Sequence, residues 1–196
     1  DGVNRNPERV KRLLRSYARN VSQQIPYATI RKDILANDST TLNEDTVLDY
    51  VKALKQLFVV EDLAAWTPNI RSKAAIRTTD TRHFVDPSIG TAVLGLGPKD
   101  LISDLQTFGL FFEEMVVRDL RVYADALDGE MYHYRDSNGL ECDAVLHLRN
   151  GSYALFEVKL GGEERINEGA SSLMALSDII DRTRMPAPSF MAVITA

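Results

Sequence analysis

Two short stretches of the chain carry residue types that could act together in chemistry. Asp143 precedes an Asn150-Gly151 turn, and the triplet Glu157-Val158-Lys159 follows it. Because side chains alternate along a strand, a hairpin through this turn would bring Asp143 close to Glu157 and Lys159. Two carboxylates and one amine on the same patch of sheet suit metal-dependent hydrolysis of a phosphodiester. We therefore predict a catalytic site at these three residues.

The expected metal is Mg²⁺, a hard cation that binds carboxylate and water oxygens. Asp143 and Glu157 would be its ligands, and Lys159 would orient the nucleophile or stabilise the developing negative charge. Glu113 is an acidic residue within an apolar helical stretch, and we predict it as a further ligand that completes the site. An alternative stays open, because Glu-Val-Lys at a strand end is also typical of a solvated edge that discourages aggregation.

The first half of the chain predicts a winged helix-turn-helix-like module over residues 1–90. Apolar residues recur at helical spacing over residues 7–22, 29–35 and 43–57. Residues 57–63 and 81–85 read as a pair of strands that form a wing. The third helix and the wing would bind nucleic acid through the basic residues Lys52, Lys55, Arg71, Lys73 and Arg77. A protein-docking module is the competing interpretation.

The second half predicts a mixed α/β domain over residues 91–196, after a junction rich in glycine and proline near residues 90–100. Residues 101–127 read as one long helical region. Strands are expected at 131–135, 140–148 and 153–160, joined by two hairpin turns, and a helix with its apolar positions between 166 and 180 follows. The last strand, 190–195, would run parallel to the third because a helix intervenes.

Composition is that of an ordinary globular protein: of 196 residues, 44% are hydrophobic and 26% charged. No apolar stretch approaches a membrane span, and the single cysteine, Cys142, fits a reducing compartment, so we expect a cytoplasmic protein. Residues 1–90 carry 14 Lys and Arg against 11 Asp and Glu, whereas residues 91–196 carry 9 against 17. A nucleic-acid surface is therefore expected in the first half.

Glu113, Asp143 and the Glu157-x-Lys159 pair resemble the motif of the PD-(D/E)xK restriction-endonuclease-like nucleases. The order of elements, a helix followed by a three-stranded meander, a helix and a strand, is similar as well. This resemblance implies a three-layer fold with a mixed sheet flanked by helices. It also implies nuclease chemistry at the four residues.

A longer resemblance, to a C-terminal domain of bacterial AAA-type ATPases known as domain of unknown function 4143, covers nearly the whole chain. The similar stretches are Ser16-Tyr17-Ala18-Arg19-Asn20, Ala65-Trp66-Thr67-Pro68, His83-Phe84-Val85-Asp86-Pro87-Ser88, Thr107-Phe108-Gly109, Val117-Arg118-Asp119-Leu120, Gly139-Leu140-Glu141-Cys142-Asp143 and Phe156-Glu157-Val158-Lys159-Leu160-Gly161. This resemblance implies that an ATPase domain precedes the chain and binds the ATP, and that the last strand is cut short.

Together these features predict a C-terminal fragment of a bacterial AAA-type ATPase whose nuclease-like module binds and cleaves DNA with Mg²⁺. The alternative is a nuclease fold without catalysis that serves as an interaction or regulatory module for the ATPase. No ATP hydrolysis is expected from the fragment itself, because Gly95-Leu96-Gly97-Pro98-Lys99-Asp100 is too short for a phosphate-binding loop. Partners would be DNA and the ATPase domain, with the oligomeric state open.

Overall fold

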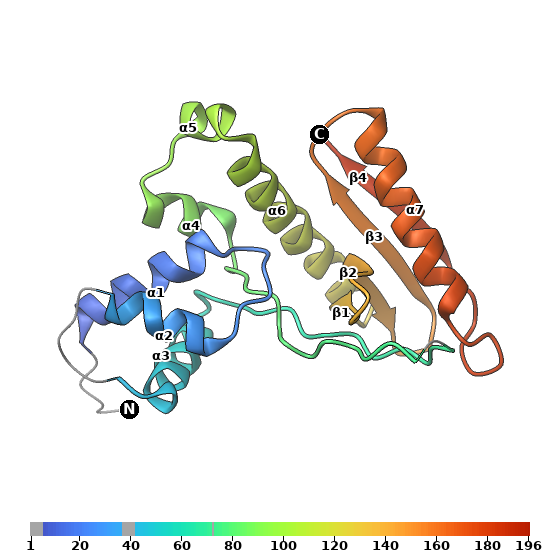
Figure 1. The fold of residues 1–196 in the computed structure, drawn as a ribbon, viewed down its shortest axis with the longest axis horizontal. Coiled ribbons are helices and arrows are strands. Elements are labelled where there is room, and N and C mark those ends of the chain that lie inside the picture. Colours follow the sequence, from blue (N-terminus) through green and yellow to red (C-terminus); the bar gives the residue numbers. More distant parts are fainter. Residues whose placement is uncertain (1–5, 37–41, 72) are drawn as a thin grey trace. The chain divides into compact units, whose positions relative to one another are not determined.

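The structure, a computed structural model, describes residues 6–36, 42–71 and 73–196 (Figure 1). The chain folds into two compact units, each built from two separate stretches of the sequence. The first unit takes the chain up to Asp62 together with Thr81–Glu114, and the second takes Leu63–Asp80 together with Met115–Ala196. The division into domains 1–90 and 91–196 stays a prediction; in the compact units, residues 63–80 belong with the C-terminal sheet.

The first unit is helical, and its three N-terminal helices form where the sequence predicts them: α1 (Pro7–Arg19), α2 (Tyr27–Leu35) and α3 (Glu44–Gln56). The side chains of Asn6 and Asn43 accept backbone N–H groups at the starts of α1 and α3, which satisfies donors that the helices leave open. The apolar faces of these helices meet in one core. Its buried members include Leu13, Tyr17, Ile30, Ile34, Val47, Val51, Phe84 and Phe111.

The predicted wing does not form as a pair of strands. Val60 and Phe84 make one isolated antiparallel bridge, with Glu61 N donating to His83 O at 2.9 Å. The reason lies at the start of the predicted strand, where Phe58 has a φ of 54° and the backbone turns instead of extending. The prediction of a strand over 57–63 is therefore wrong, and the winged-helix assignment itself stays a prediction.

The long helical region predicted at 101–127 is interrupted once. After α4 (Pro87–Leu94), the short helix α5 (Pro98–Ser103) ends at Asp104, whose ψ of 83° breaks the helical path. The Asp104 side chain then accepts the backbone N–H of Thr107, which starts α6 (Leu105–Ala126). A residue that favours helix starts thus divides the region into two helices.

The second unit contains a four-stranded sheet in the order β1-β2-β3-β4. The strands β1 (Gly129–Arg135), β2 (Glu141–Leu148) and β3 (Tyr153–Lys159) form the predicted antiparallel meander. After α7 (Glu163–Ile179), β4 (Phe190–Thr195) pairs with β3 in parallel, as predicted for a connection through a helix. The described residues thus confirm a mixed α/β fold with an open mixed sheet.

Residues 63–80 cover part of the edge of β1. Ala65 pairs with His133 and Ile76 with Asp136, and Trp66 packs against Tyr153 with ring centroids 5.1 Å apart. The core of this unit lies where α7 packs on the sheet, and contains Trp66, Tyr134, Cys142, Val145, Tyr153, Leu155, Leu173, Leu176 and Ile180. The segment expected to connect the two wing strands therefore completes the second unit.

The single cysteine, Cys142, is buried, and burial raises the pKa of its thiol. None of the helices within the described ranges is both long enough and apolar enough to cross a membrane.

Candidate active site on strands β2 and β3

A bulge in β2 positions Asp143. Tyr132 pairs with Val145 and Tyr134 pairs with Cys142, so two residues of β2, Asp143 and Ala144, stand opposite the single residue His133 of β1. Such a bulge bends the strand and re-aims its side chains. The regular pairing of β2 with β3 extends to Ala144 and Phe156, the residues next to Asp143 and Glu157. The hairpin therefore brings the two predicted acids to neighbouring strands.

Asp143, Glu157 and Lys159 converge as predicted. Lys159 Nζ lies 3.4 Å from Asp143 Oδ2 and forms an ion pair with Glu157 Oε2. Asp143 Oδ2 also accepts the backbone N–H of Val158 at 2.8 Å, which fixes the Asp143 carboxylate against β3. One ammonium group thus serves two carboxylates.

Helix α7 buries Glu157. Only 3% of the Glu157 side chain is exposed, compared with 15% for Asp143 and 26% for Lys159. A Cβ atom at Gly169 of α7 would lie 3.2 Å from Glu157 Cβ and 3.2 Å from Val193 of β4. The absence of a side chain at Gly169 therefore allows α7 to pack this closely over Glu157.

The electrostatics of the cluster follow from this burial. Burial, and then the negative charge of Asp143, raise the pKa of Glu157 from 4.5 to about 8, although Lys159 opposes the shift. Burial alone would lower the pKa of Lys159, but Asp143 and Glu157 raise it above its ordinary range. Glu157 Oε1 is buried and has no hydrogen-bond partner among the described residues. The cluster has one positive group for two acids and one carboxylate oxygen without a partner.

The donor set has the chemistry that Mg²⁺ prefers, because carboxylate oxygens are hard ligands and Mg²⁺ usually keeps several waters. Asp143 and Glu157 would hold the ion, and the partnerless Glu157 Oε1 is the kind of atom that a cation would satisfy. Within the described part of the chain, no three His, Cys, Asp or Glu residues gather closely enough for a metal site.

Glu113 lies half-buried on α6 in the part that belongs to the first unit, so its role as a ligand stays a prediction. Its neighbour Glu114 is the fully buried acid: it accepts Phe84 N at 2.6 Å and lies 2.6 Å from His83 Nδ1. Only the helical spacing of the apolar residues around them could indicate from the sequence which of the two adjacent glutamates, Glu113 or Glu114, is the buried one. Sequence reasoning missed this buried contact between Glu114 and His83.

The five predicted nucleic-acid residues divide between the units. Lys52 is exposed on α3, whereas Lys55 Nζ lies 3.1 Å from Asp62. Arg71 and Arg77 use their backbone N–H groups to bind Ile179 O and Arg135 O in the second unit. Lys73 lies on the same segment. The wing that was expected to group these side chains does not exist as a ribbon, so each stays a separate prediction.

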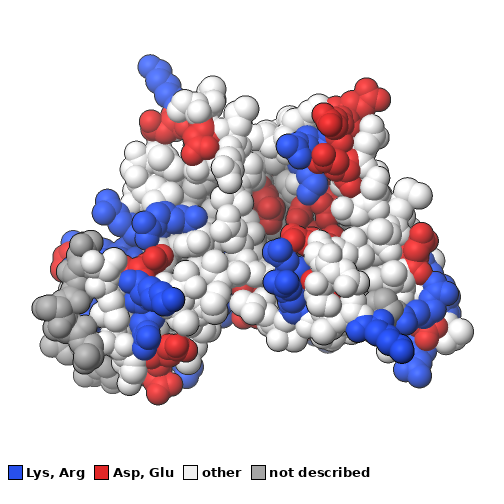
Figure 2. Space-filling model, in the orientation of Figure 1, with Lys and Arg blue, Asp and Glu red and all other residues white. Residues whose placement is uncertain are grey.

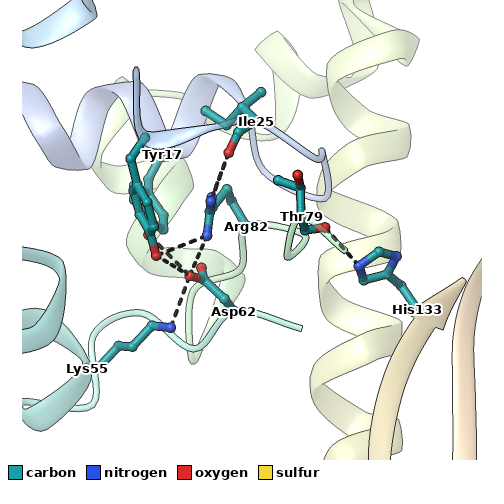
Figure 3. Close-up of polar contacts among 8 residues, drawn as sticks. Tyr17, Ile25, Lys55, Asp62, Thr79, Arg82 and His133 are labelled. Atoms are coloured by element: carbon teal, nitrogen blue, oxygen red, sulfur yellow. Dashed lines mark hydrogen bonds and ion pairs between the residues drawn. The ribbon is translucent and has the colours of Figure 1, made fainter. Parts of the chain in front are cut away.

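Sequence reasoning missed a buried ionic cluster in the first unit (Figure 3). Asp62 Oδ2 accepts Arg82 Nη1 at 2.6 Å, and the hydroxyl of Tyr17 lies 3.4 Å away. Arg82 also donates to the carbonyl of Ile25 through Nε and Nη2. The available signal was the presence of two oppositely charged residues, Asp62 and Arg82, in the two segments that were expected to form the wing strands.

Comparisons with known proteins match two family models to separate parts of the chain. Residues 108–189 match the family model described as Domain of unknown function (DUF4143), which confirms that resemblance for the second half. The first half matches a different family model. The longer resemblance was expected to cover nearly the whole chain, whereas the match to that family covers residues 108–189. No curated protein and no solved structure matches the chain. Residues 2–100, half of the chain, match the model described as Domain of unknown function (DUF8612), and the chain therefore belongs to that family.

Proposed function

We propose that the second unit is a Mg²⁺-dependent nuclease module that binds and cleaves DNA, working within a bacterial AAA-type ATPase. The single observation that carries this proposal is the cluster of Asp143, Glu157 and Lys159, in which two largely buried carboxylates share one ammonium group. The restriction-endonuclease-like layering and the winged-helix-like first half belong to the same proposal. The resemblance of the four-residue motif and the order of elements support it.

The charge balance of the cluster favours a bound cation. With both acids ionised, the three side chains carry one net negative charge in a site where α7 excludes water from Glu157. Glu141, on the same strand as Asp143, adds to the rise in the pKa of Glu157. A divalent cation would offset this excess charge and occupy Glu157 Oε1, which has no partner among the residues described.

Each side chain then has a distinct role. Asp143 is held by Val158 N and is the preformed ligand. The raised pKa of Glu157 favours its protonated form in the absence of a cation, so Glu157 would become a ligand by losing a proton when the cation binds. Bound Mg²⁺ would supply positive charge to the phosphate and acidify the attacking water. Lys159, freed from one carboxylate, would stabilise negative charge on the phosphate.

The test is cleavage of single-stranded, duplex and branched DNA with Mg²⁺ or Mn²⁺, compared between the unmodified chain and Asp143→Asn. We expect cleavage to fall at least about 100-fold in Asp143→Asn, because the variant removes a charge that neutralises the metal. Glu163→Gln, which changes an exposed acid on α7, is the matched control and should cleave normally. Equal activity of Asp143→Asn and the unmodified chain would contradict the proposed site.

A second candidate function is the catalytically inactive interaction module, and one observation favours it. Acidic side chains gather at the start of α7 (Figure 2), where Glu163, Glu164 and Glu168 line one hollow. DNA would meet repulsion on this side of the unit. Absence of both metal binding and cleavage in the unmodified chain would favour this candidate over the nuclease.

A further inference from the structure

A row of arginines on α1 lines a groove in the first unit. Arg12, Arg15 and Arg19 stand three and four residues apart, so their side chains follow one side of the helix. They border a hollow of about 430 Å³ whose other walls include Asp33 of α2 and Leu94 of α4. A second hollow of about 430 Å³ adjoins it, because Arg12 and Arg15 border both. The two hollows form one groove along α1.

The positive charge of this groove exceeds the negative charge that lines it. Its basic residues are Lys11, Arg12, Arg15 and Arg19, and its acids are Glu8 and Asp33. Lys11 pairs with Glu8 at 2.9 Å and Arg19 with Asp33 at 3.2 Å. Arg15 is exposed and has no ion pair or hydrogen bond within the described residues. Among the described residues that line the groove, basic side chains therefore outnumber acids by two.

The ion pairs within the groove contribute little to stability, so a bound phosphate could replace the acids in them. In the pair of Arg19 with Asp33, 59% of the arginine side chain is exposed, and exposed pairs contribute about 0–1 kcal/mol. Arg12 is anchored differently, because its Nη1 donates to the carbonyl of Ile34 at 3.2 Å. Arg12 is thus anchored at one end of the row, whereas the side chains of Arg15 and Arg19 are exposed to solvent.

The residue type and the spacing both match a phosphate backbone. A guanidinium group binds phosphate oxygens through two parallel hydrogen bonds, and the groove uses arginine at three of its four basic positions. Arg12 to Arg19 covers about 10 Å along the helix axis, the rise of about three nucleotides of one strand. Figure 2 shows Lys and Arg side chains on the side of the first unit where α1 and α2 lie in Figure 1.

We propose that the α1 groove, defined by Arg12, Arg15 and Arg19, binds the phosphate backbone of a nucleic acid. This site replaces the α3 face as the nucleic-acid surface of the first unit, since Lys55 of α3 is committed to Asp62. It goes beyond the proposed nuclease, because binding at the groove needs neither a metal nor Asp143. Contacts to phosphate make the binding independent of base sequence.

The experiment measures fluorescence anisotropy of a labelled duplex with the full chain in EDTA, which prevents cleavage. Arg15→Glu should weaken binding about tenfold at moderate salt and reduce the slope of log K against log salt by about 1. Lys99→Glu is the matched control: it makes the same charge change at an exposed position of α5, which does not line the groove, and should bind as the unmodified chain does. Melting temperatures confirm that both variants are folded.

Three results would overturn the proposal. The first is a lack of binding by the unmodified chain at low salt. The second is an equal loss in Arg15→Glu and Lys99→Glu, which would reflect net charge and not the groove. The third is displacement of the duplex by polyglutamate at equal charge, which would identify an acidic protein as the partner. A failed cleavage assay leaves this proposal intact, so the two proposals are tested separately.

Discussion

The two units each bury a carboxylate beside cations, but the balance of charge is opposite. In the first unit, Asp62 Oδ2 receives both Arg82 Nη1 at 2.6 Å and Lys55 Nζ at 3.1 Å (Figure 3). In the second unit, one amine, Lys159, serves both Asp143 and Glu157. In the first cluster the negative charge of one acid is fully neutralised by two cations. In the second, the charge of two ionised acids exceeds that of one cation, so a further cation could bind.

The pKa shifts reflect this difference. Burial alone would lower the pKa of Arg82, but Asp62 raises it, so the charged pair is retained. In the second unit, burial and the charge of Asp143 raise the pKa of Glu157 to about 8. Both clusters leave one carboxylate oxygen without a partner among the described residues, Asp62 Oδ1 and Glu157 Oε1. The number of cations per acid, and not the partnerless oxygen, therefore separates a structural cluster from a candidate metal site.

The largest effect is expected when the first cluster is broken. Asp62→Ala leaves Arg82, whose side chain is 3% exposed, without its anion, and should destabilise the chain by about 3–5 kcal/mol. Thermal denaturation should show a melting temperature lower by at least about 6 °C. Glu168→Ala, which removes the partner of exposed Arg165, should change stability by less than about 1 kcal/mol. If both variants melted together, the Asp62 cluster would not be structural.

The next effect concerns the helix that buries the second cluster. Gly169→Val would push α7 away from Glu157 and Val193, and should cost about 1–3 kcal/mol through overpacking. It should also weaken metal binding because Glu157 shifts. Glu164→Val introduces the same residue at an exposed position of α7, where the helix propensity of valine costs about 0.5 kcal/mol. An unchanged melting temperature in Gly169→Val would argue against close packing at this point.

The next prediction concerns the pH dependence of stability that Glu157 causes. The folded chain keeps the Glu157 proton up to about pH 8, while the unfolded chain releases it near 4.5, so this group lowers stability as pH rises between those values. Glu157→Gln removes the titration. Its melting temperature relative to the unmodified chain should rise from pH 5 to pH 8 by at least about 3 °C, because the raised pKa of Glu157 is linked to more than about 1 kcal/mol over this range. Glu163→Gln should give a constant difference, and a falling difference for Glu157→Gln would contradict the raised pKa.

Regular periodicity predicted the elements well. The apolar spacing of α1 and α3 identified both helices, and the parallel pairing of β4 followed from the intervening helix. The convergence of Asp143 and Glu157 was also predictable, because the Asn150-Gly151 turn sets the register of the hairpin.

The remaining features depend on contacts between distant residues. The positive φ of Phe58 has no local signal, because phenylalanine rarely adopts it. Residues 63–80 were expected to connect the two strands of a wing, yet they join the second unit through pairing with His133 and Ile180. The close approach of α7 at Gly169 likewise depends on how the helix lies over the sheet. A glycine within a helical apolar pattern was the available signal for this packing.

Calorimetric titration of Mn²⁺ into the full chain at pH 7 tests most directly whether Asp143 and Glu157 form a cation-binding pair. We expect one site per chain, with close to one proton released on binding, measured from the heats in two buffers of different ionisation enthalpy, because Glu157 must give up its proton. Asp143→Asn should abolish this signal, while Glu163→Gln should retain it. Absence of binding to the unmodified chain, or equal binding by Asp143→Asn, would contradict the account.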